Sequence, residues 1–129
     1  MEFPEDLKYS KEHEWVLVEG NVATVGITDY AQDQLGDIVF VELPAIGDKV
    51  SKEDAFGVVE SVKAVSDIYA PVSGKVLEAN DDLPENPEML NEDPYGDGWI
   101  IKIEMNDPDE LADLMSAKEY EAYVAEEKE

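Results

Sequence analysis

The residues best suited to chemistry lie in a predicted hairpin centred on Lys63. Apolar runs flank it, residues 56–59 before the segment 60–64 and residues 68–71 after it. Both runs are rich in β-branched and aromatic residues, which favour strands, so a chain reversal at residues 62–64 directs the lysine amine away from the rest of the protein. The amine is then a handle for a covalent group or, in the plainer interpretation, a solvated surface charge.

Other reactive groups are scarce. The chain has no cysteine, which excludes a disulfide, a thiolate nucleophile and a cysteine-based zinc site, so any redox sulfur must come from a cofactor. His13 is the only histidine and is interpreted as a packed or surface imidazole rather than a zinc ligand. The segment 93–98 is interpreted as a turn rather than a calcium loop, because Pro94 and Tyr95 interrupt the ligand pattern. No metal site is therefore predicted.

Sequence signatures of catalysis are also missing. The chain has no G-x-S-x-G elbow and no phosphate-binding loop, and the segment 96–98 lacks the third glycine of a dinucleotide fingerprint. Carboxylates are so numerous that their proximity in the sequence says nothing about acid–base catalysis. The sequence therefore predicts no catalytic residue.

Length and hydropathy favour one small domain. The 129 residues, 43% of them apolar, suffice for a single hydrophobic core. No stretch approaches the roughly 18 apolar residues that a membrane-spanning helix needs, and the acidic residues 1–6 are unlike a signal or transit peptide. We expect a protein of the prokaryotic cytoplasm, or of the mitochondrial matrix only if a transit peptide has been removed.

The charge is strongly acidic. Nine lysines, no arginine and 33 carboxylates give a formal net charge of −24, which repels phosphate backbones and argues against nucleic acid binding. Three interpretations of this charge remain: a solvated surface that keeps the protein soluble and monomeric, adaptation to a salty cytoplasm, or steering toward partners with basic faces.

The pattern of the first half predicts strands with one short helix. Strands are expected over 14–18 and 22–27, joined by a tight turn at Gly20-Asn21, because both turn residues tolerate positive φ. Thr28 is the expected N-cap of a helix that ends at Gly36. A strand over 37–43 should end at Pro44.

The second half adds strands and then helices. Strands are predicted over 56–62, 65–69, 75–78 and 99–105. In the last of these Trp99, Ile101, Ile103 and Met105 should face inward and Ile100 outward. The loop 80–98 is expected to be irregular or only briefly helical. From Pro108 the spacing becomes helical, and Ser116 is the expected cap of the second of two helices.

The hairpin around Lys63 resembles the lipoyl-attachment hairpin of the glycine cleavage system H protein family. The matching residues there are Glu60-Ser61-Val62-Lys63-Ala64 and the run 66–74. Other short strings agree with the family in order along most of the chain: Leu7-Lys8-Tyr9, His13-Glu14-Trp15, Val25-Gly26-Ile27-Thr28, Ala31-Gln32, Leu35-Gly36-Asp37, Val41-Glu42-Leu43-Pro44, Pro94-Tyr95 and Gly98-Trp99. Several unrelated strings in one order are far more specific than a single lysine motif.

This resemblance implies a mainly β fold, a flattened barrel-sandwich hybrid of the lipoyl and biotinyl type. A short helix should lie in the N-terminal third and two helices at the C-terminus, within one lipoyl-carrier domain over residues 1–129. Lipoic acid would be attached covalently to Lys63 in a carrier subunit that is not an enzyme. Glu60 and Gly74 match positions associated with recognition by the lipoylating enzyme, and in the plainer interpretation they are a strand charge and a turn glycine.

The resemblance also implies partners. The arm would collect an aminomethyl group from glycine decarboxylase, the P protein, and pass the methylene to tetrahydrofolate at the aminomethyltransferase, the T protein. Dihydrolipoamide dehydrogenase, the L protein, would reoxidise it. A carrier that docks at three active sites needs a rigid tip, which a tight hairpin supplies.

A cleft for the loaded arm is implied as well. An aminomethyl group on a thiol carries an ammonium and decomposes in water, so a shielding cleft with carboxylate partners is expected. The matching acidic residues are Glu14 and Asp67, and the expected apolar walls are Ile27, Leu35 and Ala64. Glu12 stands where we expect a small hydroxyl residue in the family.

Two alternatives remain open from the sequence. One is a different carrier, either a lipoyl domain of a 2-oxoacid dehydrogenase or a biotinyl domain. Val62 and Ala64 replace the methionines typical of biotinyl hairpins, and the shorter lipoyl domains lack the Trp99 strand and the C-terminal helices. The other is an H-like binding module without a cofactor, which an unmodified Lys63 in a lipoylating host would indicate.

Overall fold

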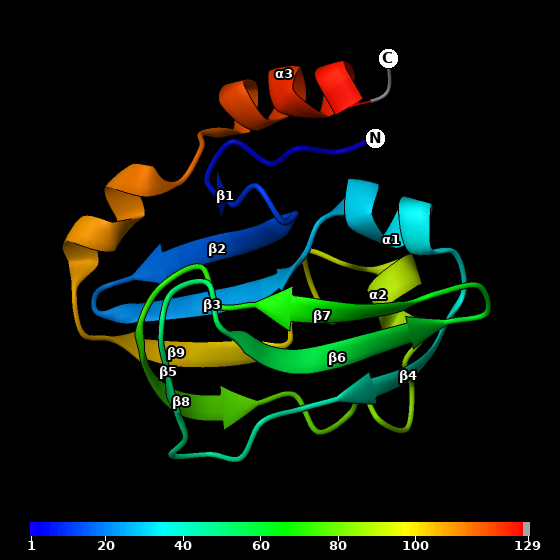
Figure 1. The fold of residues 1–129 in the computed structure, drawn as a ribbon, viewed down its shortest axis with the longest axis horizontal. Coiled ribbons are helices and arrows are strands. Elements are labelled where there is room, and N and C mark those ends of the chain that lie inside the picture. Colours follow the sequence, from blue (N-terminus) through cyan, green and yellow to red (C-terminus); the bar gives the residue numbers. More distant parts are fainter. Residues whose placement is uncertain (128–129) are drawn as a thin grey trace.

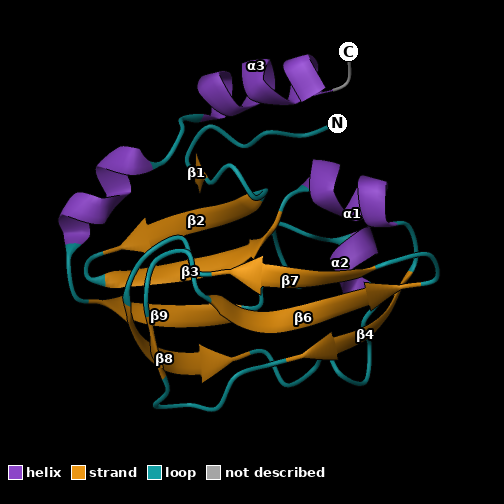
Figure 2. Ribbon diagram, viewed as in Figure 1, coloured by secondary structure: helices purple, strands orange, loops and turns teal. Residues whose placement is uncertain are grey.

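A computed structural model describes residues 1–127, which form two antiparallel sheets with short helices around their edges (Figures 1 and 2). The six-stranded sheet has the order β1-β2-β3-β9-β8-β5: Lys8–Tyr9, Glu14–Glu19, Val22–Ile27, Ile101–Met105, Gly74–Ala79 and Lys49–Val50. The three-stranded sheet has the order β4-β6-β7: Ile38–Glu42, Ala55–Ser61 and Val65–Tyr69. The pairings do not close into a barrel, and the predicted mainly β fold is confirmed.

The helices are short. α1 is Asp29–Leu35, α2 is Met89–Glu92, the 3-10 helix η1 is Pro108–Asp113, and α3 is Ala117–Glu127. The first of the two predicted C-terminal helices is thus a 3-10 helix. Within residues 1–127 no helix combines the length and the apolar character needed to cross a membrane.

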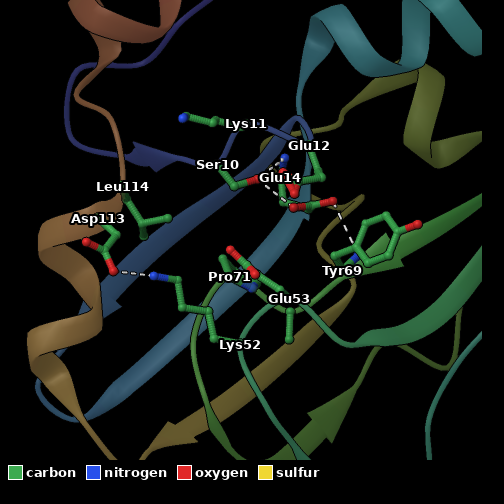
Figure 3. A pocket seen from close by; sticks show the side chains of 11 residues that line it. Ser10, Lys11, Glu12, Glu14, Lys52, Glu53, Tyr69, Pro71, Asp113 and Leu114 are labelled. Atoms are coloured by element: carbon green, nitrogen blue, oxygen red, sulfur yellow. Dashed lines mark hydrogen bonds and ion pairs between the residues drawn. The ribbon is translucent and has the colours of Figure 1, made fainter.

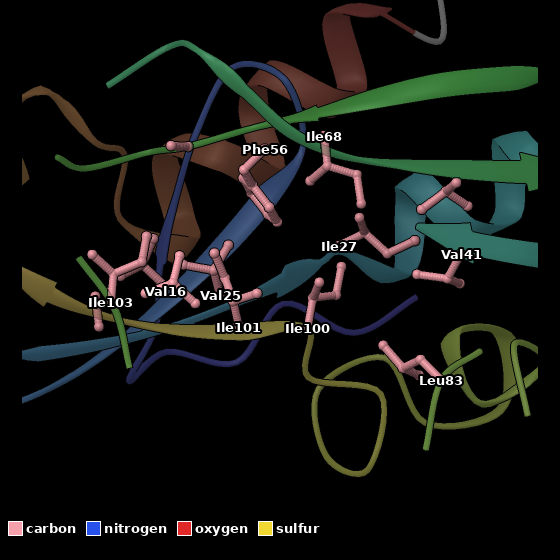
Figure 4. Close-up of a cluster of buried hydrophobic side chains, with 14 of the residues drawn as sticks. Val16, Val25, Ile27, Val41, Phe56, Ile68, Leu83, Ile100, Ile101 and Ile103 are labelled. Carbon is pink, nitrogen blue, oxygen red and sulfur yellow. The ribbon is translucent and has the colours of Figure 1, made fainter. Parts of the chain in front are cut away.

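The main core lies between the two sheets (Figure 4). Val16, Val25 and Ile103 come from the larger sheet, and Val41 and Ile68 from the smaller one. Burying each such side chain stabilises the fold by about 1.5–3 kcal/mol. Because apolar and polar residues alternate along the strands, each sheet has one apolar face. Burial of these two faces against each other holds the sheets together.

A second apolar cluster packs α3 against β1 and β2. The rings of Tyr9 and Tyr120 stack with centroids 4.6 Å apart, and Trp15 belongs to the same cluster. This cluster anchors the N-terminal segment that leads into β2, and β2 begins at Glu14. The helix therefore fixes the start of a strand that carries a predicted site residue.

Local signals set the helix ends where the sequence predicted them. Thr28 Oγ1 accepts a hydrogen bond from Ala31 N at 3.1 Å, and Gly36 ends α1 with φ of 79°. Ser116 and Glu119 exchange hydrogen bonds, with Ser116 N to Glu119 Oε1 at 2.9 Å and Glu119 N to Ser116 Oγ at 3.2 Å. Such a capping box satisfies two backbone donors at the start of a helix.

The prediction for residues 99 and 100 was wrong. Ile100 is fully buried in the main core, whereas Trp99 is half-buried and packs against the second cluster. β9 starts only at Ile101, so the two-residue alternation does not extend back to these positions. The Ile100 backbone instead donates to Val25 O at 2.8 Å and accepts from Asn80 N at 2.9 Å.

Candidate functional site

Lys63 lies at the tip of the hairpin between β6 and β7, at the right edge of Figure 1. Ser61 builds this tip: its Oγ accepts hydrogen bonds from Ala64 N at 3.0 Å and Lys63 N at 3.3 Å. The backbone closes the turn because Ser61 N donates to Ala64 O at 2.8 Å. Ser61 thus rigidifies the tip. The sequence analysis did not assign this role, although serine is a common turn residue and stands here two positions before Lys63.

The Lys63 side chain is exposed and lies over Gly36, at the end of α1. A Cβ atom at Gly36 would stand 3.3 Å from Lys63 Cε, so the glycine leaves room for the lysine stem. Gly36 also adopts positive φ, which favours glycine on its own account. Among residues 1–127, the Lys63 amine has no ion-pair partner.

Asn91 in α2 holds the platform beneath the tip. Its Oδ1 accepts from Ile38 N at 2.9 Å, and its Nδ2 donates to Gly36 O at 2.9 Å. Asp37, between these two residues, accepts through its carbonyl a hydrogen bond from Val62 N at 3.0 Å. One side chain thus fixes the segment on which the hairpin tip rests. Sequence reasoning missed Asn91 because nothing distinguishes it within an irregular loop.

Glu14, only 3% exposed, lies beside Tyr69 at the end of β7 (Figure 3), whereas Lys63 precedes the start of that strand. Its Oε1 accepts a hydrogen bond from Ser10 Oγ at 2.5 Å, and its Oε2 accepts one from Tyr69 N at 3.3 Å. Burial nevertheless raises the pKa of the Glu14 carboxyl from 4.5 to about 7, because desolvation outweighs both hydrogen bonds. The group therefore changes charge near neutral pH.

Glu14 lines a pocket of about 350 Å³. Lys52 on one wall forms an ion pair with Asp113 of η1, so the 3-10 helix closes that side (Figure 3). Glu12 also lines the pocket as an exposed carboxylate, while the hydroxyl that contacts Glu14 comes from Ser10. Glu12 therefore adds a second carboxylate to the lining of the Glu14 pocket.

The structure does not bring all the predicted cleft residues together. Asp67 is exposed on the outer face of the small sheet and lines a different pocket from Glu14. Ile27 is buried in the main core (Figure 4). Leu35 is partly buried at the edge of that core, and Ala64 is exposed at the tip. Glu14 and Lys63 are separated by the length of β7, about 17 Å for five residues of strand.

The two predicted recognition residues lie in strands. Glu60 is half-buried in β6 and pairs with Phe40 and Val65 on the neighbouring strands. Gly74 lies in β8, where a Cβ atom would stand 2.0 Å from Glu104 O, so close packing of backbones requires a glycine there.

Comparison with known proteins decides the family. A sequence model described as "Glycine cleavage H-protein" matches residues 7–127. The chain belongs to this family. The glycine cleavage system H protein of Carboxydothermus hydrogenoformans is 60% identical over 126 residues, which cover 98% of this chain and 97% of the relative. That of Staphylococcus saprophyticus is 58% identical over 126 residues, covering 98% of this chain and all of the relative.

A solved structure supports the same assignment. The crystal structure of a glycine cleavage system H protein from Mycobacterium marinum superposes with a TM-score of 0.88 at 38% identity, covering 95% of this chain and 98% of the other. The chain is thus a lipoyl carrier of the glycine cleavage system and works with the other proteins of that system. The expected family and cofactor are confirmed.

Proposed function

We propose that Lys63 is the residue that carries the lipoyl group. The observation that carries this proposal is the exposed amine at the tip of a hairpin braced by Ser61. Bound there as an amide, lipoic acid supplies a disulfide that is opened and closed as it accepts and releases groups. The tip and the platform held by Asn91 keep the attachment point rigid, which limits the entropy lost on each docking event.

We also propose that the chain serves its partners as a carrier of the lipoyl arm and is not itself an enzyme. Its specific partners would be glycine decarboxylase, aminomethyltransferase, dihydrolipoamide dehydrogenase and the lipoylating enzyme. An exposed lysine on a projecting tip supports this role, because each partner has to receive the arm in its own active site. Residues 1–129 would form one carrier domain, which we expect to be monomeric and cytoplasmic.

Glu14 is proposed as the partner of the cationic amine on a loaded arm. Its carboxyl is desolvated and positioned by Ser10, and it lines a pocket with room for a ligand. A cation that entered this pocket would favour the ionised carboxylate and lower its pKa from about 7. Asp67 stays a prediction for the arm cleft, with a weaker effect, because exposed charge pairs contribute little. Ile27, Leu35 and Ala64 also stay predictions as cleft walls.

Intact mass and peptide mapping test the attachment site. Protein made in a host with an active lipoylating enzyme should carry one lipoyl increment, located on Lys63. Lys63→Gln should abolish the increment, while Lys75→Gln, at an exposed lysine in β8, should retain it. An increment on another lysine would contradict the attachment site. Its complete absence would instead favour a binding module without a cofactor.

A further inference from the structure

The outer face of the small sheet carries an unusual row of side chains beside Lys63. Strand register places Phe40 of β4, Glu60 of β6 and Val65 of β7 directly opposite one another. Phe40 is 45% exposed and Val65 is 68% exposed. Glu60 between them is half-buried, so its carboxylate stands between two apolar side chains, three residues before Lys63.

Two more apolar residues extend this row. Val62 at the tip is 70% exposed, and Val39 is 54% exposed at an irregularity in β4 next to Phe40. Four of the six large apolar side chains that are strongly exposed in residues 1–127 therefore gather around the attachment point. We name these four, Val39, Phe40, Val62 and Val65, the tip patch. Clustered apolar exposure of this kind marks an interaction site.

The charges beside the tip patch are acidic. Glu60 lies within the row, and the next row of the same face pairs Glu42 and Asp67 across Val58. Lipoylation converts Lys63 into a neutral amide, which removes the cation at the tip itself. Two copies of this chain would bring their carboxylates together at net charges of −24 each, so self-association through this face is opposed.

Building on the proposed function, we propose that the tip patch is the docking face for the enzyme that loads the arm. The fitting partner surface is an active-site entrance with apolar side chains for the tip patch, a Lys or Arg opposite Glu60, and further basic residues opposite Glu42 and Asp67. Apolar contact combined with opposite charges is the arrangement of a transient, electrostatically steered interface. The arm and the docking face are then on the same surface of this chain. Binding of the enzyme to that face therefore places the arm at the entrance of the enzyme's active site.

The test compares lipoylated variants as substrates of a glycine decarboxylase that accepts the parent protein. The triple variant Phe40→Thr, Val62→Thr and Val65→Thr removes apolar side chains of the tip patch while retaining good strand formers. Ile46→Thr is the matched control, because Ile46 is 66% exposed but lies in the loop after β4, outside the patch. Samples are first purified to full lipoylation by intact mass. The rate at which a small phosphine reduces the lipoyl disulfide is then measured, to check that the arm is equally accessible in the parent and in each variant.

The triple variant should raise the KM for the carrier at least about fivefold, or about 1 kcal/mol of binding free energy, with kcat within twofold of the parent. Ile46→Thr should leave both constants unchanged. For the parent, KM should rise with sodium chloride as the opposite charges of the two surfaces are screened. An unchanged KM in the triple variant, or an equal rise in Ile46→Thr, would overturn the docking face while leaving the attachment site intact. A fully lipoylated parent that no glycine decarboxylase loads would instead contradict the proposed function.

Discussion

The side chain of Glu14 joins the two sheets by accepting a hydrogen bond from the backbone of Tyr69. Glu14 opens β2 of the large sheet, and Tyr69 ends β7, whose second edge has no strand partner among residues 1–127. The distance from Tyr69 N to Glu14 Oε2 is 3.3 Å, and Ser10 Oγ holds the other carboxyl oxygen. A carboxyl group thus satisfies a backbone donor on an otherwise unpaired strand edge.

This buried carboxyl predicts a specific pH dependence of stability. The pKa of Glu14 is raised from 4.5 to about 7 in the folded state, so the folded protein binds this proton more tightly than the unfolded chain. The stabilisation of the folded state by this proton is complete below pH 4.5 and is lost as the pH rises through about 7. A difference of about 2.5 pKa units corresponds to roughly 3 kcal/mol.

Glu14→Gln isolates this effect, because the amide imitates the neutral acid toward both Ser10 and Tyr69. Urea unfolding at pH 5 and pH 8 should show the parent losing up to about 3 kcal/mol relative to the variant on going to the higher pH. Glu121→Gln, at an exposed position in α3, controls for the general loss of one negative charge. If the free energy of unfolding depended on pH in the same way for the parent and Glu14→Gln, the raised pKa of Glu14 would be contradicted.

The loaded arm should decay faster without the Glu14 charge. Losing the partner of a shielded charge typically costs about 2–5 kcal/mol, less where water enters, so Glu14→Gln should speed release of ammonia from the methylamine-loaded form at least several-fold. Asp67→Ala should have a smaller effect because Asp67 is exposed. Ammonia release in buffer at pH 8 measures both. Asp109→Ala is the surface-charge control, and equal lifetimes in all variants would show that neither carboxylate protects the arm.

Asn91 should link stability to lipoylation. Asn91→Ala removes the acceptor of Ile38 N and the donor to Gly36 O, which should lower the free energy of unfolding by about 1–3 kcal/mol. Because the same groups hold the platform under the tip, the rate of lipoylation of Lys63 should fall as well, at a temperature where the variant is fully folded. Asn86→Ala is the control, because within the described part of the chain the Asn86 side chain makes a single hydrogen bond, from its Nδ2 to Asp82 O at 3.3 Å. A normal lipoylation rate in Asn91→Ala would limit its role to stability.

Features that depend on neighbouring residues were predictable from the sequence. The β2–β3 hairpin, the Thr28 and Ser116 caps and the exposed position of Lys63 follow from turn chemistry, short-range hydrogen bonds and alternating hydropathy. The same alternation failed at Ile100, where the backbone pairs with Val25 and Asn80 before β9 begins. The periodicity of a short segment does not show which distant residues its backbone will bond to.

By itself the sequence determined the presented lysine and the mainly β fold, because turn chemistry and strand periodicity are local properties, and it indicated the family through the resemblance of its motifs. Only the tertiary structure decided what surrounds the site. Glu14 meets Tyr69 across 55 positions of chain, and Asn91 meets Gly36 across the same separation. The burial that raises the Glu14 pKa, and the alignment of Phe40 with Val65, arise from sheet packing and register. Long-range contacts of this kind depend on how all the elements fill one core, which no short stretch of sequence specifies.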